Sequence, residues 1–407
     1  MPSQKNHILL MGQTPPPWHG QAVATQILFE YDWPEFEVHR LRMEFSGEML
    51  EVGRFQWKKL HHLWSLIFQA RQILKENPGS VLLYPPASAK WVPFLRDLIF
   101  LHAVRHLAGS TVFIFHASGL PVFVEQHWLK RLLAQRAYHG AQVSLEVAQE
   151  EVPPHRVFEA KTSRWCPCGI TVPELQRPRR DLAAPYQVLF VASLQEGKGL
   201  LEILRTAADL KQQGKEDKFS FQIVGRWFSD EFEKEARSLR TKLGLERMVN
   251  FIGQLTGDDK WQAYLNADVF FFPSHYASEA TPIVLMEALG MGLPIISTQW
   301  AGIPAMLEGC PTAQLLPIHS PQRYSEALTR LASERRIDDA TAEQSREFYR
   351  DNFLPKRFIE RVTDAFHLAI QLTSPRLKED DKSVVTPDSP KITISAYLAD
   401  QNPKLGR

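Results

Sequence analysis

The sequence predicts an α/β protein made of two doubly wound parallel-sheet domains. Short apolar runs alternate with longer segments of helical period, as strands and helices do in such sheets. The alternation is interrupted at 166–186 by a segment with four prolines and a basic cluster, and it starts again at residue 186. With 407 residues, 44% of them hydrophobic, the chain is long enough for two cores.

The first domain is expected over residues 1–170. Two amphipathic stretches in it predict helices, at 57–76 and 122–139, and four apolar runs predict buried strands. The strands are expected at 7–12, 80–85, 111–116 and 141–145.

The second domain is expected over residues 171–349 and repeats the pattern. Helices are predicted at 198–213 and 230–243. Strands are predicted at 186–193, 219–225, 248–253, 268–274 and 294–298. Ligands of open parallel sheets bind at the carboxyl ends of the strands, so each domain would present a crevice. A ligand held between the two domains would be shielded from water on closure.

Composition favours a cytoplasmic protein that is soluble or peripheral to a membrane. The net charge is +1, which gives no argument for a nucleic-acid partner. Cys166, Cys168 and Cys310 cannot form a disulfide framework, and the spacing of the first two is not that of a zinc site. The start of the chain lacks the features of a signal peptide, and charges interrupt every long apolar run.

The tail at 374–407 differs from the rest of the chain. It is polar, contains several prolines and carries the charge run KEDDK, a composition typical of disorder. Its short ITISAYL segment is the one part expected to be able to form an ordered contact.

Two carboxylates mark the segment 274–307, SHYASEATPIVLMEALGMGLPIISTQWAGIPAML. Glu279 and Glu287 are separated by seven residues, and a helix is predicted from Pro282 to Gly290. Proline suits the first turn of a helix, where its missing N–H would be unpaired in any case.

This predicted helix would offer an anion site at its start. The backbone N–H groups of Ile283 and Val284 would lie at the positive end of the helix dipole, which suits a diphosphate, and Glu287 would reach a ribose beside it. The alternative is that Glu279 is an ordinary helix-start carboxylate and Glu287 a solvated helix residue. The preceding apolar strand and the following glycine-rich turn favour the ligand site.

The segment resembles the E-x7-E signature of glycosyltransferase family 4, retaining enzymes with two facing Rossmann-like domains (the GT-B architecture). The flanking FFFPS, GLPIIST and AGIP stretches fit as well, and the resemblance extends to about residue 370. The stretch 346–370 resembles the family's closing helix, which implies that a helix at 350–372 crosses back to complete the first domain.

The resemblance implies roles for the residues of the signature. Glu279 would lie beside the transferred sugar and Glu287 would bind the ribose of the donor. The backbone N–H groups of Thr281, Ile283 and Val284 would hold the phosphates.

The segment VASLQEGKG (191–199) resembles a second family motif, V-G-R-L-x-x-x-K-G. Lys198 would supply a cation to the donor diphosphate, whose charge grows as it leaves. Ser193 replaces the family's arginine, and Arg226 could supply the missing charge. The alternative for Lys198 is a solvated lysine after a strand.

Two further stretches resemble the family in the first domain. FHASGLP (115–121) would place His116 at a strand end, in contact with the donor sugar; the alternative is a hydrogen-bonded core histidine. GQTPPPWHGQA (12–22) resembles the first loop, with Gly20 retained and His19 in place of the other glycine of the family's pair.

No cofactor or metal is expected beyond the nucleotide-diphosphate sugar donor. The sequence has no D-x-D pair to hold a divalent cation, so the helix dipole and Lys198 would stabilise the diphosphate. The family implies front-face attack, in which the leaving phosphate oxygen takes the acceptor's proton.

An aromatic and basic stretch at 54–75, with KWVPFLRDLIF at 90–100, would suit peripheral contact with an anionic membrane. The alternative, slightly favoured, is that Trp57, Leu60, Trp64 and Ile67 form the buried face of a domain helix.

The sequence therefore predicts a retaining glycosyltransferase that uses a UDP- or GDP-type donor, with a glycan or lipid-linked acceptor in surface polysaccharide biosynthesis. Two alternatives stay open. One is a non-catalytic, nucleotide-sugar-binding partner subunit of the same fold. Ser193 and His19 favour it, because each departs from the family's pattern. The other is a sugar-nucleotide epimerase, which would need no acceptor.

Overall fold

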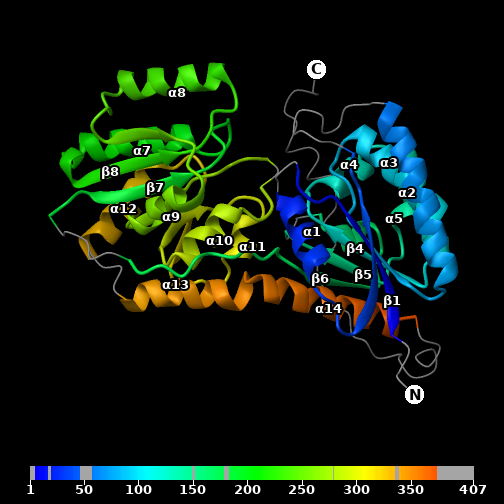
Figure 1. Cartoon of the computed structure of the whole chain (residues 1–407). Coiled ribbons are helices and arrows are strands. Elements are labelled where there is room, and N and C mark those ends of the chain that lie inside the picture. The colour runs from blue at the N-terminus through cyan, green and yellow to red at the C-terminus, as the bar shows by residue number, and fades with distance from the viewer. Residues whose placement is uncertain are drawn as a thin grey trace, which may run out of the picture.

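A computed structural model describes residues 5–16, 20–45, 57–148, 152–177, 183–277, 279–334 and 339–373. The described residues form two six-stranded sheets with helices around each (Figure 1). All the strand pairs in both sheets are parallel. The predicted α/β class with two doubly wound domains is confirmed. The expectations for the tail at 374–407 and for His19 lie outside the described residues.

The first sheet has the strand order β2-β1-β3-β4-β5-β6. Its strands are β1 (Asn6–Gly12), β2 (Phe36–Arg42), β3 (Val81–Tyr84), β4 (Ser110–Phe115), β5 (Val143–Glu146) and β6 (Thr162–Trp165). The helices of this part are α1 (Gly20–Glu30), α2 (Trp57–Glu76), α3 (Trp91–Val104), α4 (Leu120–Glu125), α5 (Trp128–Tyr138) and α6 (Pro154–Val157). β1 shows why its apolar run forms a central strand: Ile8 and Leu10 enter one core, and Leu9 and Met11 enter the core on the opposite face.

The second sheet has the order β12-β11-β10-β7-β8-β9. Its strands are β7 (Tyr186–Val191), β8 (Phe219–Val224), β9 (Val249–Gly253), β10 (Val269–Phe272), β11 (Ile295–Thr298) and β12 (Ala313–Leu316). The helices are α7 (Leu200–Gln212), α8 (Asp230–Lys242), α9 (Gly257–Leu265), α10 (Ile283–Gly290), α11 (Ile303–Met306), α12 (Pro321–Glu334), α13 (Asp339–Asn352) and α14 (Pro355–Gln371).

Each predicted strand is found within two residues of its expected bounds, but the sequence pattern missed β2, β6 and β12. All three are edge strands. An edge strand is only partly covered, so polar residues interrupt its apolar run, as in FEVHRLR of β2 and TSRW of β6.

The helix predicted at 122–139 is in fact two helices, α4 and α5. The break lies at Gln126 and His127, where the His127 side chain caps α5 by accepting a hydrogen bond from the Leu129 N–H (3.2 Å). The helix predicted at 57–76 is found as α2.

The end of the chain crosses between the two halves. α13 packs on α10 of the second half, and α14 packs on β3, β4 and β5 of the first (Figure 1). The break between them lies at Phe353 and Leu354, where Pro355 begins α14. The single helix expected at 350–372 is thus the last turn of α13 followed by α14.

The segment that joins the sheets lies beside this crossing. The Ile170 N–H donates to the Phe353 carbonyl (2.9 Å), and the Tyr349 hydroxyl donates to the Ile170 carbonyl (2.6 Å). A side chain on Gly169 would come within 2.6 Å of the Leu354 backbone. The two chain segments that connect the halves, one at Ile170 and the other at Phe353, are therefore hydrogen-bonded to each other.

α2 corrects the expectation for the aromatic and basic stretch. Ile67 is buried, as the core alternative required, and Leu60 is half-buried, but the side chain of Trp64 is 61% exposed. The side chain of Trp57 lies outside the described residues. Part of the aromatic face of α2 therefore points to solvent. No described helix is long and apolar enough to cross a membrane.

Candidate active site

The N-termini of two helices lie close together between the halves of the molecule. α10 begins at Ile283, with Pro282 as its N-cap rather than in its first turn, which corrects the predicted start by one residue. A Cβ added to Gly20, the first residue of α1, would lie 3.7 Å from the Ile283 side chain. The first N–H groups of a helix have no acceptor within the helix, so Ile283 and Val284 offer donors at this point. Two dipoles with their positive ends together form a site suited to an anion.

Glu279 lies directly before this point and is 5% exposed. Its Oε2 accepts hydrogen bonds from Lys198 Nζ (2.8 Å) and from the Ser274 hydroxyl (2.6 Å). Lys198 Nζ also lies 4.4 Å from the centre of the Tyr276 ring. The two residues that the sequence analysis placed at the sugar and the diphosphate are therefore in direct contact.

Two glycines allow the chain to approach this pair closely. Gly199 has φ +97°, and a Cβ there would lie 2.4 Å from the Pro273 carbonyl oxygen. Gly302 donates its N–H to the Glu279 carbonyl (3.0 Å), and a Cβ there would lie 1.9 Å from the Ala280 oxygen. A side chain at Gly199 would displace the backbone at Pro273, and one at Gly302 would displace the backbone next to Glu279.

Glu287 is 8% exposed, so the alternative of a solvated helix residue is wrong. Its Oε1 accepts from Lys260 Nζ (2.9 Å) and its Oε2 from the Tyr264 hydroxyl (2.8 Å), both on α9. Burial, aided by the charge of Glu287, raises the pKa of Tyr264 well above its usual range, so the phenol stays a donor. The carboxylate is held rigidly on the second domain.

Thr281 connects the two halves through its side chain. Its hydroxyl donates to the Val147 carbonyl (2.8 Å), beyond the end of β5, and the Val147 N–H donates to the Phe115 carbonyl (3.2 Å), at the end of β4. His116 follows Phe115 directly and is half-buried. The predicted His116 thus lies at the same edge of the sheets as the signature segment.

Ser193 and Arg226 lie beyond the ends of neighbouring strands, β7 and β8. Both are exposed, and the Arg226 carbonyl accepts from the N–H of Leu194 (2.8 Å). The Ser193 hydroxyl accepts from the Gln195 side chain (2.9 Å). The backbone of Arg226 therefore lies next to that of Leu194, one residue from Ser193, and its suggested compensating role stays a prediction.

Several site residues were not anticipated from the sequence. Ser274, Tyr276, Lys260 and Tyr264 hold the two carboxylates, and Gly302 supports the backbone of the first. Ser274, Tyr276 and Gly302 lie within the signature stretch, but their contacts arise only when β7, β10 and β11 align. Lys260 and Tyr264 lie a helical turn apart on α9, a spacing that could have marked them as one face.

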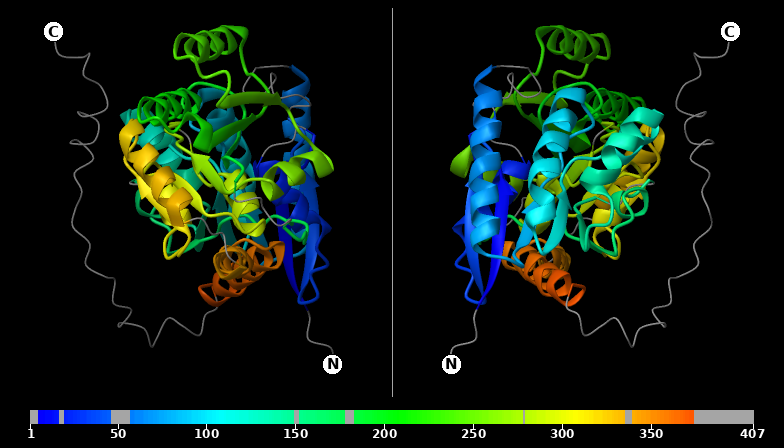
Figure 2. Two further views of the ribbon diagram at one scale, coloured as in Figure 1. Left: turned by 90° about the vertical axis from the view of Figure 1, so that its left-hand side faces the viewer. Right: turned by 90° about the vertical axis from the view of Figure 1, so that its right-hand side faces the viewer.

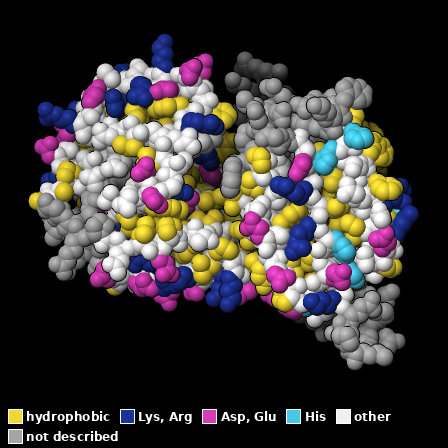
Figure 3. Space-filling view, viewed as in Figure 1, with side chains coloured by type: hydrophobic (Ala, Val, Ile, Leu, Met, Phe, Trp, Pro, Cys, Tyr) yellow, Lys and Arg dark blue, Asp and Glu magenta, His cyan; other side chains and the backbone are white. Residues whose placement is uncertain are grey.

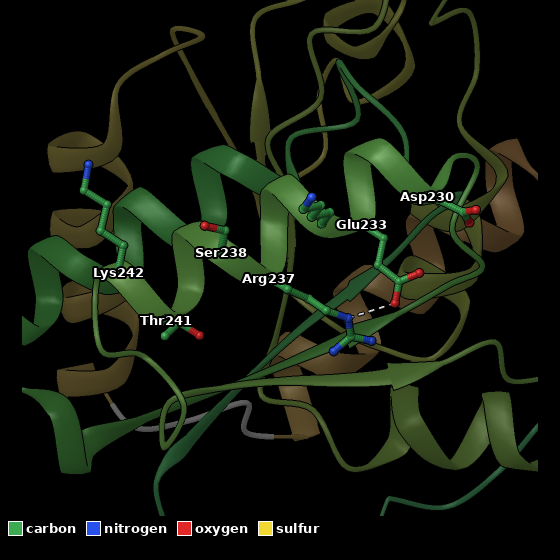
Figure 4. Close-up of a pocket in the computed structure, with 7 residues that line it drawn as sticks. Asp230, Glu233, Arg237, Ser238, Thr241 and Lys242 are labelled. Atoms are coloured by element: carbon green, nitrogen blue, oxygen red, sulfur yellow. Dashed lines mark hydrogen bonds and ion pairs between the residues drawn. The ribbon is translucent and has the colours of Figure 1, made fainter.

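Two other features lie apart from this site. A hollow on the outer helix α8 is lined by Glu233, Arg237 and neighbouring residues, with Glu233 and Arg237 paired at 2.8 Å (Figure 4). Among the described residues, His7, Glu37 and His39 bring potential metal-ligand atoms within 4.8 Å of one another on β1 and β2. None of the predicted site residues belongs to either group, and the expectation of a metal-independent reaction stays a prediction.

Comparison with known proteins supports the same assignment. Residues 174–348 match the model of the family described as glycosyl transferases group 1. The chain is 28% identical over 284 residues to the amylovoran biosynthesis glycosyltransferase AmsK of Erwinia amylovora, covering 62% of this chain and 66% of AmsK. It is 28% identical over 162 residues to the D-inositol 3-phosphate glycosyltransferase of Corynebacterium jeikeium, covering 38% of each. It therefore spans no more than two thirds of the length of these relatives.

Solved structures show the same fold. Sucrose-phosphate synthase from Thermosynechococcus elongatus has a TM-score of 0.62 at 17% identity, covering 90% of this chain and 99% of that one. HepE of Anabaena, in complex with UDP, has a TM-score of 0.63 at 14% identity, covering 89% and 99%. The likeness covers both sheets, and the predicted GT-B architecture is confirmed.

Proposed function

We propose that this chain, of which residues 174–348 match the group 1 glycosyltransferases, is a retaining enzyme of that family that transfers a sugar from a nucleotide-diphosphate donor. The observation that carries this proposal is the meeting of Lys198 and Glu279 beside the paired N-termini of α1 and α10. Backbone N–H groups and one lysine suit the two charges of a diphosphate, and HepE, a protein of the same fold, binds UDP.

Each residue of the candidate site has a proposed role that follows from its position. The α10 N-terminus and Lys198 would hold the diphosphate and stabilise its growing charge as the bond to the sugar breaks. Glu287, held by Lys260 and Tyr264, would accept a hydrogen bond from the ribose. Glu279, beside Lys198, would face the sugar, and His116 would contact it from the first domain. Arg226 would supply the second cation, in place of the family's arginine that Ser193 replaces.

We propose a UDP- or GDP-type donor and, as acceptor, a growing surface polysaccharide or its lipid-linked precursor. AmsK, named for amylovoran biosynthesis, supports the polysaccharide class. The proposed location is cytoplasmic, at or near the inner membrane face. All three cysteines are free and buried, as a reducing compartment would allow.

A panel of UDP- and GDP-sugars tests the proposal. Release of nucleoside diphosphate is followed with purified wild type, Glu279→Gln and Glu235→Gln, an exposed glutamate on α8 that serves as the matched control. We expect release with one donor, loss in Glu279→Gln and no change in Glu235→Gln. The anomeric configuration of the product, read by NMR, tests retention. Equal release by all three variants would refute the assigned site.

A partner subunit that binds the donor without turnover is the second candidate. Ser193 in place of the family's arginine, and Lys198 already neutralised by Glu279, favour it. Thermal stabilisation by a nucleotide, with no release from any donor in the presence of lipid-linked or glycan acceptors, would decide for this candidate.

A further inference from the structure

Three helices of the first domain expose large apolar side chains on one face. We call it the α2–α3–α5 face and define it by six residues at i, i+4 spacing: Trp64 and Phe68, Leu95 and Ile99, Trp128 and Leu132. Their exposed fractions are 61%, 71%, 45%, 43%, 68% and 56%, in that order. Because each pair lies one turn apart on its helix, the three pairs form outward stripes.

The same helices bury a second apolar stripe. Ile67, Leu98 and Ala134, one on each helix, are buried in the core against the first sheet. A helix that is apolar toward the core alone has a polar outer face, whereas these three are apolar on both sides. Exposed apolar patches of this kind mark sites of interaction with another surface.

The three stripes adjoin one another. α3 packs against α2 on one side and against α5 on the other. The right-hand view of Figure 2 looks onto this layer, which lies on the side of the first sheet away from the second domain (Figures 1 and 2). A flat surface could contact all three helices at once.

Positive charge is concentrated on the same helices. α2, α3 and α5 together contain eight Lys and Arg against two acidic residues, a net charge of +6. The whole chain carries +1, so the remainder carries −5. Asp97 is buried and paired with Arg96 (2.6 Å), and Lys130 is buried. Lys75, Arg131 and Arg136 on these helices are exposed. Away from this face, basic and acidic side chains are interspersed, as Figure 3 shows over the second domain.

We propose that the α2–α3–α5 face docks on an anionic lipid bilayer, with the rings of Trp64, Phe68 and Trp128 among the headgroups and the basic side chains against the lipid phosphates. Aromatic rings beside lysines and arginines suit this interface. A second copy of the chain is the disfavoured occupant, because it would bring together two sets of helices that each carry a net charge of +6.

This inference rests on the proposed function and deepens it, because a protein bound to the bilayer through this face would be close to a lipid-linked acceptor in the same bilayer. Lys130 supports the face from beneath: its ammonium lies 3.5 Å from the centre of the Phe123 ring and 5.0 Å from that of Trp91. These contacts connect α5 with α4 and α3, so they hold together two of the three helices that carry the face.

Co-sedimentation of the full chain with vesicles tests the inference. One set of vesicles is pure phosphatidylcholine, and the other contains about one third phosphatidylglycerol, which is anionic. Each basic side chain near the anionic surface should raise the affinity for those vesicles about fivefold. We expect binding to the anionic set and little to the neutral one. Phe68→Ser should weaken binding about tenfold, as for an aromatic ring withdrawn from an apolar phase. Arg131→Gln should weaken it about fivefold.

Matched controls come from the second domain and the chain's end. Phe228 is 69% exposed, almost the same as Phe68, so Phe228→Ser should leave vesicle binding unchanged. Lys356, with a side chain 81% exposed, is the control for Arg131. Thermal melting confirms that each variant is folded.

Three outcomes would overturn the inference: no binding by wild type, equal binding to both vesicle sets, or equal losses in Phe68→Ser and Phe228→Ser. A solution dimer that Phe68→Ser dissociates would assign the face to a second copy instead. Vesicle binding needs no turnover, so it can stand if donor cleavage is not found. Conversely, release of nucleoside diphosphate without vesicle binding would leave the proposed function standing and remove this inference.

Discussion

Removal of the Glu279 carboxylate should destabilise the ligand-free protein and make it more responsive to nucleotide. In Glu279→Ala, Lys198 keeps its charge but loses a partner at 2.8 Å, within a site where the two side chains are 15% and 7% exposed. Removing one member of a buried ion pair costs about 3–5 kcal/mol. Because Lys198 keeps some access to water, we expect the lower end, about 3 kcal/mol, with about 1 kcal/mol more for the Ser274 hydroxyl, which loses its acceptor (2.6 Å).

The second part of this prediction concerns the ligand. A diphosphate would restore a negative charge beside Lys198, so it should recover in the variant part of the stability lost with the carboxylate. Unfolding in urea, with and without a nucleoside diphosphate, measures both effects. The ligand should raise the free energy of unfolding more in Glu279→Ala than in wild type, although turnover is lost.

The double variant Lys198→Ala, Glu279→Ala gives the decisive comparison. If the cost comes from the unpaired ammonium, the double variant should be more stable than Glu279→Ala alone, with a coupling of about 2 kcal/mol. Additive losses would refute the reasoning. So would a Glu279→Ala variant that is as stable as Glu235→Ala, the exposed control.

Three more outcomes are expected. Glu287→Gln should weaken nucleoside diphosphate binding about 10–100-fold in calorimetry, the scale of a hydrogen bond to a charged group, and unchanged affinity would remove its assigned role. Burial raises the pKa of Cys166 to about 12 and that of Cys168 to about 11. Neither thiol should therefore react with a disulfide reagent near neutral pH until the protein unfolds. Rapid labelling of the native chain would contradict this prediction. Burial lowers the pKa of His275 below its ordinary 6.5, so the unfolded chain binds the proton more readily than the folded chain. The stability of the protein should therefore fall as the pH drops below about 6.5. His275→Gln should make the melting temperature depend less on pH in this range, and an unchanged pH profile would contradict the role of His275.

The central strands could be predicted because burial on both faces demands an unbroken apolar run. VLLY of β3 and VFFF of β10 consist wholly of buried residues, and both were found in the sequence. The edge strands β2, β6 and β12 could not be predicted in this way, because half their surface is free to be polar; the edge strand β9 was found. A break such as that between α4 and α5 also escaped the pattern, since it depends on one histidine capping the backbone.

For the candidate site, local motifs singled out Glu279, Glu287 and Lys198: the two carboxylates lie before and within a helix that follows a proline, and 191–199 resembles a family motif. It could not show that Lys198 and Glu279 form an ion pair, 81 residues apart in the chain. Nor could it show that Lys260 and Tyr264 hold Glu287. Such contacts depend on how separate strands and helices align.

The sequence by itself determined the α/β class, the two successive sheets and the motif at the start of α10, because these follow from local periodicity and composition. Only the tertiary structure decided which side of each helix meets the core. Along α2 the apolar residues extend around the helix, so the pattern alone could not say that Ile67 is buried and Trp64 exposed. That choice is made by the sheet and by α3, which can cover only one side of the helix and leave the other side exposed.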